Sequence, residues 1–571
     1  MNHPSTHPVW NIWGNPIFRR YCQSRLRPQG LGVTLLITLL IAGFIFFMTR
    51  TWSMSQNLLS PREAELATIL PLFIFQALIL FVMGTALVSG GMTAEKDEGV
   101  IDYQRLIPMS PLAKVLGYLF GLPIREYVMF LATLPFTIRA MWVGQVPMSA
   151  WLPLYAILIT STLTYHLTGL LTGTAIKNRR WSFLVSIAIV TCLYTVIPFM
   201  AKFGLVFFKY LTIRPVLDEN LPKILPHTAG AALETLQRIA PEVKFFDLNF
   251  PEWAFTLFCQ SGLIITFLIM LCRRWQRQES LLLGKVWATG FFAWIQILLL
   301  GNALPLIDPG NLFPSRGFAR FNPGSDWAPQ AGEAVALSGI YGAVTLLILA
   351  VMIMMITPDS DIQIRGWRRA RKEGRNSLPG LSDAATAFPW VVAMSMAAAG
   401  GWYIFTHALV ESRWFPGHVV PLGVLGIFML VMFSHAVAFH SLLEAKGKRT
   451  LGLAVIFIGA VPLMIGAVLC ANQRLVPAAS WLFGISPVSA PVYAAAVQLS
   501  LNELPANLAK AVPRAFYFWQ VVSFLTALWL AAGLRAERKA IAGSADRPPG
   551  EQEDPAAPQD NASAPPSQNF S

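Results

Sequence analysis

Apolar runs of about 20 residues recur along the chain, separated by short polar or basic segments. A run of that length is enough to cross the hydrocarbon core of a bilayer as a helix. We therefore expect an all-α polytopic membrane protein with about twelve transmembrane helices, because helices satisfy their own backbone hydrogen bonds within lipid. The expected spans are residues 31–48, 67–89, 115–142, 150–176, 181–208, 252–272, 281–304, 333–357, 387–408, 418–443, 450–471 and 514–534.

Clusters of lysine and arginine follow every second span. With twelve spans, all of these clusters fall on the side of the N-terminus. Lysine and arginine gather on the cytoplasmic side of membrane proteins, so both termini are expected in the cytoplasm and the chain in the cell's inner (plasma) membrane. The clusters lie at residues 177–180, 273–277, 365–375, 446–449 and 535–539.

The first 30 residues predict a short interfacial helix on the cytoplasmic surface. Asn15 suits the N-cap and the proline that follows suits the first helical position. Ile17, Phe18 and Tyr21 then share one side, mostly away from the arginines. The alternative is a basic cytoplasmic tail without such a helix.

A charged segment from Glu95 to Pro111 separates the second and third expected spans. Its pattern predicts a two-sided helix over residues 98–107, which Pro108 ends because proline has no N–H to donate. We expect the apolar side to rest in the membrane interface and the charged side to face a soluble partner. The apolar side carries Val100, Tyr103 and Ile107, and the charged side carries Glu98, Asp102 and Arg105.

This segment resembles the loop after the second span in permease subunits of type-2 ATP-binding-cassette (ABC) exporters. That family typically shows an acidic and basic cluster, then Gly-Thr-Leu-Glu, an apolar pair and Pro-x-Ser. Here residues 95–98 supply the charges, Gly99 the glycine, Ile101-Asp102 the Leu-Glu pair and residues 108–110 the end. The chain departs from the pattern at Val100, which replaces the threonine, and at Gln104-Arg105, which replaces the apolar pair.

In that family the segment is the coupling helix that docks on the ATPase, and the same role is expected here. The alternative is an ordinary surface loop with accidental charge alternation. The coupling residues implied by the resemblance are Glu95, Lys96, Asp97, Glu98, Gly99, Asp102, Arg105, Pro108 and Ser110.

The resemblance extends to the order of spans over residues 31–280, which are expected to form a six-span permease unit. Residues 209–251 form its external segment, with a proline-rich start and a possible helix near Thr228–Ile239. Residues 281–534 add a second six-span region. That region is either a diverged second permease half or an appended helical domain. Residues 535–571 are expected to be a disordered cytoplasmic tail, because their last part is rich in proline, alanine and serine.

Composition agrees with a membrane protein: 55% of residues are hydrophobic and 13% are charged. The net charge is +13, but most basic residues lie in the expected cytoplasmic loops, which is typical of membrane topology rather than nucleic-acid binding. The five cysteines show no CxxC spacing, so we predict neither a metal site nor a disulfide framework.

The resemblance predicts a permease subunit of an ABC exporter, not an enzyme. No GxxxxGK[ST] sequence is present to cradle a nucleotide. The ATP that drives transport is therefore expected to bind a separate ATPase subunit, which acts as a dimer, and the chain itself is expected to need no cofactor. The other expected partner is the lipid bilayer; whether a second copy or another permease takes part stays open, as do the substrate and the direction of transport.

Ionisable residues within apolar runs are costly and are candidates for function. Arg125 and Glu126 lie in the third expected span; they either line a polar cavity or lie near the interface if that span begins later. As neighbours on a helix they need not pair with each other. A secondary transporter or a membrane-embedded enzyme using this pair and the histidines is the alternative function, and a scaffold is a third. The histidines His166, His435 and His440 are more simply structural, and Glu444 is expected at the surface.

Overall fold

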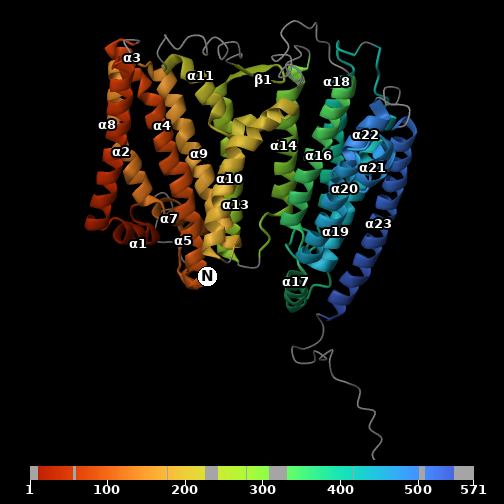
Figure 1. Cartoon of the computed structure of the whole chain (residues 1–571). Helices are drawn as coiled ribbons and strands as arrows, with labels where there is room; N and C mark the ends of the chain where they lie inside the picture. The colour runs from red at the N-terminus through yellow and green to blue at the C-terminus, as the bar shows by residue number, and fades with distance from the viewer. Residues whose placement is uncertain are drawn as a thin grey trace, which may run out of the picture.

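The computed structural model describes residues 11–55, 59–176, 178–224, 242–277, 280–307, 331–415, 417–499 and 508–544. Its helices run side by side as a bundle, and a two-stranded antiparallel hairpin lies at one end (Figure 1). Within the described residues, eleven helical runs are long and apolar enough to cross a membrane. The expected all-α polytopic class is confirmed.

Both termini of the described chain lie at the same end of the bundle, the lower end in Figure 1, which we call the α1 end.

The first half of the chain begins with a short helix and ends with a long one. The elements are α1 (Pro16–Arg25), α2 (Pro28–Ser55), α3 (Pro61–Ala67), α4 (Ile69–Ala77), the π-helix η1 (Leu78–Gly84), α5 (Thr85–Asp97), α6 (Val100–Leu106), α7 (Pro111–Gly121), α8 (Ile124–Gly144), α9 (Met148–Ala175), α10 (Arg179–Phe199), η2 (Met200–Phe203), η3 (Val206–Leu211), α11 (Arg214–Ile224), β1 (Glu242–Phe245), β2 (Leu248–Pro251) and α13 (Glu252–Gln276).

The second half contains a larger share of short helices near its end. Its elements are α14 (Lys285–Ala303), η5 (Leu304–Leu306), α16 (Ala331–Ile356), α17 (Ser360–Lys372), α18 (Phe388–Val410), α19 (Gly423–Ala454), the π-helix η6 (Val455–Ala460), α20 (Val461–Leu469), η7 (Gln473–Leu475), α21 (Val476–Phe483), α22 (Ala490–Leu499) and α23 (Leu508–Ser544).

The expected tenth and eleventh spans form one helical run, residues 423–469, that reverses direction at Gly447. Gly447 has φ 75° and ψ 179°, which is not helical. Just before it, Lys446 pairs with Glu537 near the end of α23. Further along the second arm, Gly466 contacts Phe483 of α21, whose neighbour Gly484 lies against Trp519. Trp519 precedes Glu537 by about 27 Å of helix, so the two arms run antiparallel and each is long enough to span.

The third expected span is wrong at its start. Residues 115–142 were expected to form one helix, but α7 ends at Gly121 and α8 begins at Ile124. Pro123 lies at the break, where it can start a helix but cannot continue one. The span is therefore α8, and α7 is a separate short helix at the α1 end.

The N-terminal helix is confirmed, and its apolar side is covered by protein. The Asn15 side chain caps α1 by accepting from the backbone N–H of Ile17, and its amide donates to the Ala113 carbonyl of α7 at 2.6 Å. Ile17 and Tyr21 are buried against glycines of α7, since a Cβ at Gly117 would lie 2.9 Å from Ile17. The small α7 surface brings the two helices into close contact.

Two further expectations meet the structure only in part. Residues 535–544 were expected in the disordered tail, but α23 continues to Ser544, and residues 545–571 lie outside the described part. In the external segment, the possible helix at Thr228–Ile239 also lies outside the described residues. The structure adds α11 and the β1–β2 hairpin there, with Val243 paired with Phe250.

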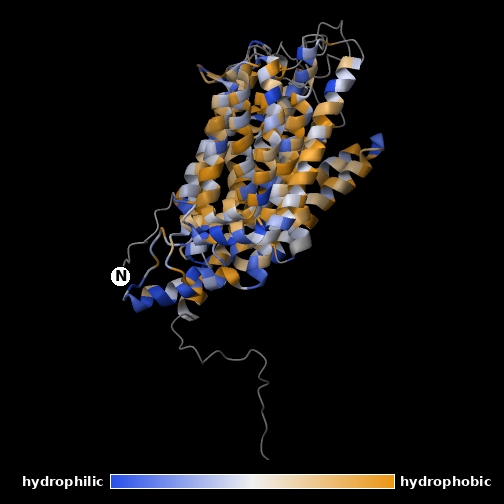
Figure 2. Ribbon diagram, turned by 90° about the vertical axis from the view of Figure 1, so that its left-hand side faces the viewer, coloured by the Kyte–Doolittle hydropathy of each residue, from blue (hydrophilic) through white to orange (hydrophobic). Residues whose placement is uncertain are grey.

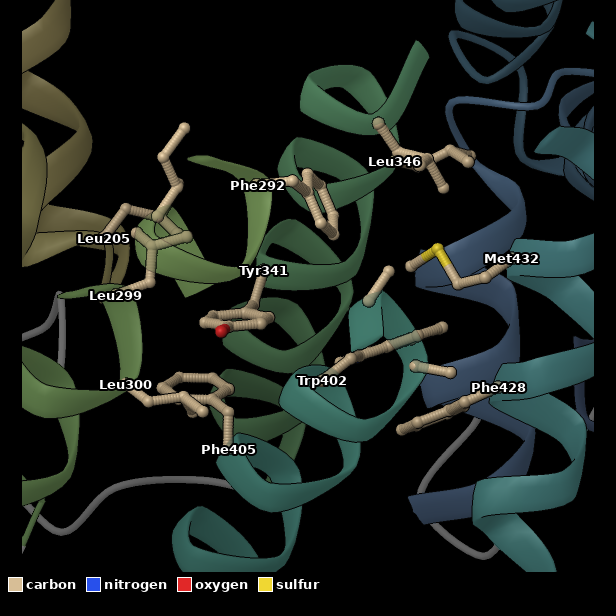
Figure 3. Packing of buried hydrophobic residues seen from close by; sticks show 14 of the residues in the cluster. Leu205, Phe292, Leu299, Leu300, Tyr341, Leu346, Trp402, Phe405, Phe428 and Met432 are labelled. Carbon is tan, nitrogen blue, oxygen red and sulfur yellow. The ribbon is translucent and has the colours of Figure 1, made fainter. Parts of the chain in front are cut away.

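Apolar side chains form both the interior and the outer surface of the bundle. Orange, hydrophobic ribbon dominates the middle of the helices in Figure 2, and hydrophilic ribbon gathers toward the ends. Leu40 and Phe44 of α2 are more than 60% exposed, as expected of helix surfaces that face lipid. In the interior of the second half, Trp402 of α18 stacks on Phe428 of α19 with ring centroids 3.5 Å apart (Figure 3).

Five helix pairings of the first half recur in the second. When the spans of each half are numbered one to six in chain order, contacts join spans one and two, one and three, two and three, two and four, and four and six in both halves. A short helix also follows the second span in both, α6 in the first half and α17 in the second. Other pairings differ. In the first half α10 packs on α5, whereas α22 takes that place on α16 in the second, and spans three and four pack extensively on each other only in the second half, as α18 and α19.

Candidate functional site

The charged segment between α5 and α7 forms a short helix that starts after a sharp break. Gly99 has φ 71°, in the left-handed region that favours glycine, and it separates α5 from α6. The predicted helix over residues 98–107 therefore starts two residues later, at Val100. At the far end, Ser110 caps α7 by accepting from the Ala113 N–H at 3.2 Å. Gly99 and Ser110 thus define the two ends of the segment.

A third side of α6, which the pattern did not single out, packs against the protein. Ile101 and Gln104 are buried, at 6% and 4% exposure. Tyr103, expected on the side that rests in the membrane interface, is 70% exposed, and Leu106 is 81% exposed. The helix is only seven residues long, so its rotation is decided by the Gly99 break and by the contact of Gln104 with α7 rather than by its own periodicity.

Glu95 of α5 faces inward and contacts side chains of α1 and α7. Its carboxylate accepts a hydrogen bond from Tyr21 Oη at 2.7 Å and forms an ion pair with Arg20, both on α1. Tyr118 Oη of α7 lies 3.1 Å from Glu95 Oε2 and 2.7 Å from Gln104 Oε1 of α6. We call Arg20, Tyr21, Glu95, Gln104 and Tyr118 the Glu95 cluster.

The two tyrosines of the Glu95 cluster are poorly ionisable. Burial raises the pKa values of the Tyr21 and Tyr118 hydroxyls above their usual value of about 10, and the nearby Glu95 carboxylate adds to both shifts. The ring of Tyr118 stacks on Trp275, near the end of α13, with centroids 5.3 Å apart. The cluster therefore joins α6 to the sixth span as well as to α1, α5 and α7.

Lysine and arginine side chains also attach this segment to its neighbours. Lys96 donates to the Thr174 carbonyl at the end of α9 at 2.6 Å. Arg105 pairs with Asp102 and donates to the Arg274 carbonyl of α13 at 3.4 Å. Lys114 of α7 lies 3.4 Å from the Arg105 carbonyl, and burial together with the Arg105 charge lowers the Lys114 pKa. These basic residues are internal contacts, although the first two were expected to be docking residues.

The remaining predicted coupling residues face outward. Asp97, Glu98, Asp102 and Pro108 are exposed, and Tyr103 and Leu106 lie exposed among them. Tyr103 was expected against the membrane interface, and the sequence pattern assigned Leu106 to neither side of the helix. We call the set Asp97, Glu98, Asp102, Tyr103 and Leu106 the α6 surface.

Arg125 and Glu126 lie in the first turn of α8, so the expectation of a place near the interface applies rather than that of a mid-span cavity. Glu126 is fully buried and its Oε1 lies 3.1 Å from Arg125 Nε. The sequence left their pairing open, and in the structure these neighbours do pair, because the arginine side chain is long enough to fold back. Glu126 Oε2 has no hydrogen-bond partner among the described residues.

The histidines of the alternative function, a secondary transporter or membrane-embedded enzyme, make internal hydrogen bonds. His166 Nδ1 lies 2.8 Å from Tyr127 Oη, and its Nε2 lies 3.0 Å from the Leu80 carbonyl in the π-helix η1. A π-helix leaves a backbone carbonyl without its usual partner, which His166 supplies here. His435 Nδ1 lies 2.8 Å from the Val431 carbonyl of its own helix.

Glu444 is buried, so its expected surface position is wrong. Its side chain is 1% exposed and accepts from Arg538 of α23 at 2.7 and 2.6 Å and from Gln363 of α17 at 2.8 Å. His440 Nε2 lies 3.2 Å from the same carboxylate. We call these four residues the Glu444 cluster. No sequence signal identified it, because Glu444 and Arg538 are far apart in the chain.

In the part of the chain that the structure describes, no group of three or more histidine, cysteine, aspartate or glutamate residues could hold a metal ion. No family model, curated protein or solved structure matches this chain. The function must therefore be argued from the site itself.

Proposed function

We propose that this chain is the membrane-spanning permease subunit of an ABC exporter, and that a separate ATPase docks on the α6 surface. The observation that carries the proposal is the two-sided construction of α6. On the outer side, Asp102 of α6 and the preceding Asp97 and Glu98 offer three exposed carboxylates beside Tyr103 and Leu106, a composition suited to a soluble partner. Its inner side is bonded to helices of the bundle through the Glu95 cluster.

This construction supports mechanical coupling. A force on α6 would reach α7 through Gln104 and Tyr118, and α13 through the Tyr118–Trp275 stack. Glu95 would carry the same force to α1 and α5. Packed side chains transmit strain because protein interiors are dense. ATP-driven movement of the partner would thus tilt several spans together and change access to the transport pathway.

The recurring helix pairings favour a second permease unit over an appended domain for residues 281–534. One chain would then supply both halves of the pathway, with α17 in the position that α6 holds in the first half. The ATPase partner would act as a dimer below the two halves. Such a chain needs no second permease to complete the pathway.

Site-directed crosslinking tests the docking surface. Cysteine is placed at Asp102 in a chain whose exposed Cys192 and Cys470 are replaced by serine. The control is Ser55→Cys, which is exposed at the opposite end of the bundle. The proposal expects a soluble ATPase, identified by mass spectrometry after mild-detergent purification, that crosslinks to the Asp102 variant and not to the control.

Failure to recover an ATPase with the Asp102 variant, while membrane insertion is intact, would overturn the proposal. Attention would then pass to the alternative, a secondary transporter or membrane-embedded enzyme that uses the buried Glu126. In that case the transport or enzymatic activity of the chain should not depend on ATP, and Glu126→Gln should abolish it.

A further inference from the structure

A second polar site lies at the α1 end, between the end of α13 in the first half of the chain and α17 in the second. A cavity of about 460 Å³ opens between the end of α13, α17 and the loop 378–384. Four arginines line it, against two carboxylates. The arginines are Arg273, Arg277, Arg365 and Arg369, and the carboxylates are Glu373 and Asp383.

The two carboxylates are already paired, which leaves the cavity electropositive. Asp383 accepts two hydrogen bonds from Arg273, at 2.7 and 2.9 Å, and one from the Leu281 backbone N–H at 3.4 Å. Glu373 lies 3.5 Å from Arg375, outside the lining. Among the described residues, Arg277 and Arg369 have no acidic side chain within ion-pair distance. An arginine without a carboxylate partner attracts a bound anion.

The wall opposite α17 is held in place by several contacts. Lys285 donates to the carbonyls of Ser382 and Ala385 at 2.6 and 2.7 Å. Gly366 of α17 packs directly against Ala384, where an added Cβ would lie 2.1 Å away. The cavity is therefore formed by fixed segments of the chain and does not depend on one loop position.

A hydroxyl without a partner also lies in this wall. Ser382 lines the cavity, and its Oγ is buried with no hydrogen-bond partner in the described structure. A buried hydroxyl without a partner costs free energy, so such groups normally have one. A ligand in the cavity would supply it.

We propose that this cavity binds a phosphate-bearing ligand. Arginine guanidinium groups match phosphate oxygens in bidentate geometry, and a serine hydroxyl is a common additional donor. The volume suits a small polar group, since ligand sites span about 300–1,000 Å³. At the end of the spans, the phosphate source that lies nearest is the headgroup of an anionic phospholipid, which basic residues near the membrane surface attract. A soluble phosphate compound is the other source.

Native mass spectrometry of the full chain tests this site. The chain is placed in nanodiscs of phosphatidylcholine with or without phosphatidylglycerol, and the anionic lipid retained after release is counted. The test variant is Arg277→Gln/Arg369→Gln. Its matched control is Arg368→Gln/Lys372→Gln, which removes the same charge from exposed positions outside the cavity lining. Ser382→Ala removes the hydroxyl without changing charge.

We expect the test variant to lose retention of phosphatidylglycerol at least tenfold, Ser382→Ala to lose it severalfold, and the control to keep it. Titration with inorganic phosphate identifies the source: a soluble ligand is assigned if millimolar phosphate displaces the lipid or binds alone with the same variant pattern. Equal losses in the test variant and its control would mean general surface attraction and would overturn the proposal. The proposal would also be overturned if every variant retained phosphatidylglycerol unchanged and none bound inorganic phosphate.

Discussion

The two short helices at the α1 end, α6 and α17, occupy the same place in the two halves and present opposite chemistry. Each follows the second span of its half. The α6 surface, which includes the residues just before the seven-residue helix, exposes carboxylates and two large apolar side chains, whereas the thirteen-residue α17 exposes arginines beside a cavity. The two proposals therefore assign different ligands to corresponding positions in the chain, a soluble protein at α6 and a phosphate group at α17.

The anchoring of the two helices is more alike than their surfaces. Beside each helix, a carboxylate forms an ion pair with an arginine from a distant segment. The pair is Glu95 with Arg20 near α6, and Glu444 with Arg538 near α17. They differ in burial, because Arg20 is 43% exposed and Arg538 is 26% exposed, and the Glu444 side chain is 1% exposed against 15% for Glu95. The comparison indicates that the second cluster contributes more to stability, and the first remains closer to solvent and to a partner.

Charge reversal on α6 should have the largest effect. Glu98→Lys/Asp102→Lys places two positive charges on the α6 surface and breaks the ion pair of Arg105 with Asp102, which is exposed. Insertion should therefore be unchanged and thermal stability should fall only slightly. ATP-driven transport in reconstituted vesicles and co-purification of the ATPase should both be lost. The matched control, Asp359→Lys/Asp361→Lys on the exposed start of α17, should keep both. Loss in the control as well would mean that the two helices do not differ as proposed.

Neutralising Glu444 should lower the stability of the protein more than neutralising Glu95. Glu444→Gln leaves Arg538 without its counter-charge in a buried site and should lower the free energy of unfolding by about 3 kcal/mol. Glu95→Gln should cost only about 1–2 kcal/mol, because its partner is closer to solvent. Melting temperatures in detergent check the order. Glu537→Gln, which breaks the exposed pair with Lys446, is the control and should change little.

Substitution of Gly99 tests the break that sets the rotation of α6. Gly99→Ala meets no atom within 4 Å, so its cost is backbone strain alone, about 1 kcal/mol at φ 71°. We expect a small fall in melting temperature but a clear loss of ATPase co-purification, because α6 would turn. Gly374→Ala, at φ 72° after α17, is the matched control and should cost the same stability while leaving co-purification intact.

The smallest expected effect is on pH dependence. The Tyr21 and Tyr118 hydroxyls have raised pKa values in the folded chain, so they stay protonated while the unfolded chain ionises above pH about 10. Their contribution to stability is present below that pH and is lost as pH rises through it. The variant Tyr21→Phe/Tyr118→Phe should show a shallower fall of melting temperature between pH 9 and 11, on the order of a few degrees. An equally steep fall in the variant would contradict this.

Local patterns in the sequence predicted much of the fold. Apolar runs located the spans, because the need to bury backbone hydrogen bonds in lipid leaves helices as the solution for such runs. The Asn15 cap and the positions of Ile17 and Tyr21 predicted α1, and Pro108 predicted the end of the coupling segment, because caps and proline act within a few residues. The outward positions of Glu98 and Asp102 followed from the same local spacing.

Only the tertiary structure decided which polar groups face inward. Glu95 pairs with a residue 75 positions earlier and Glu444 with one 94 positions later, and no local pattern specifies such partners. The rotation of α6, the reversal at Gly447 and the arginine cavity beside α17 likewise depend on how separate helices pack. Periodicity describes one helix at a time, whereas burial of a charge depends on the free energy of contacts that several helices supply together.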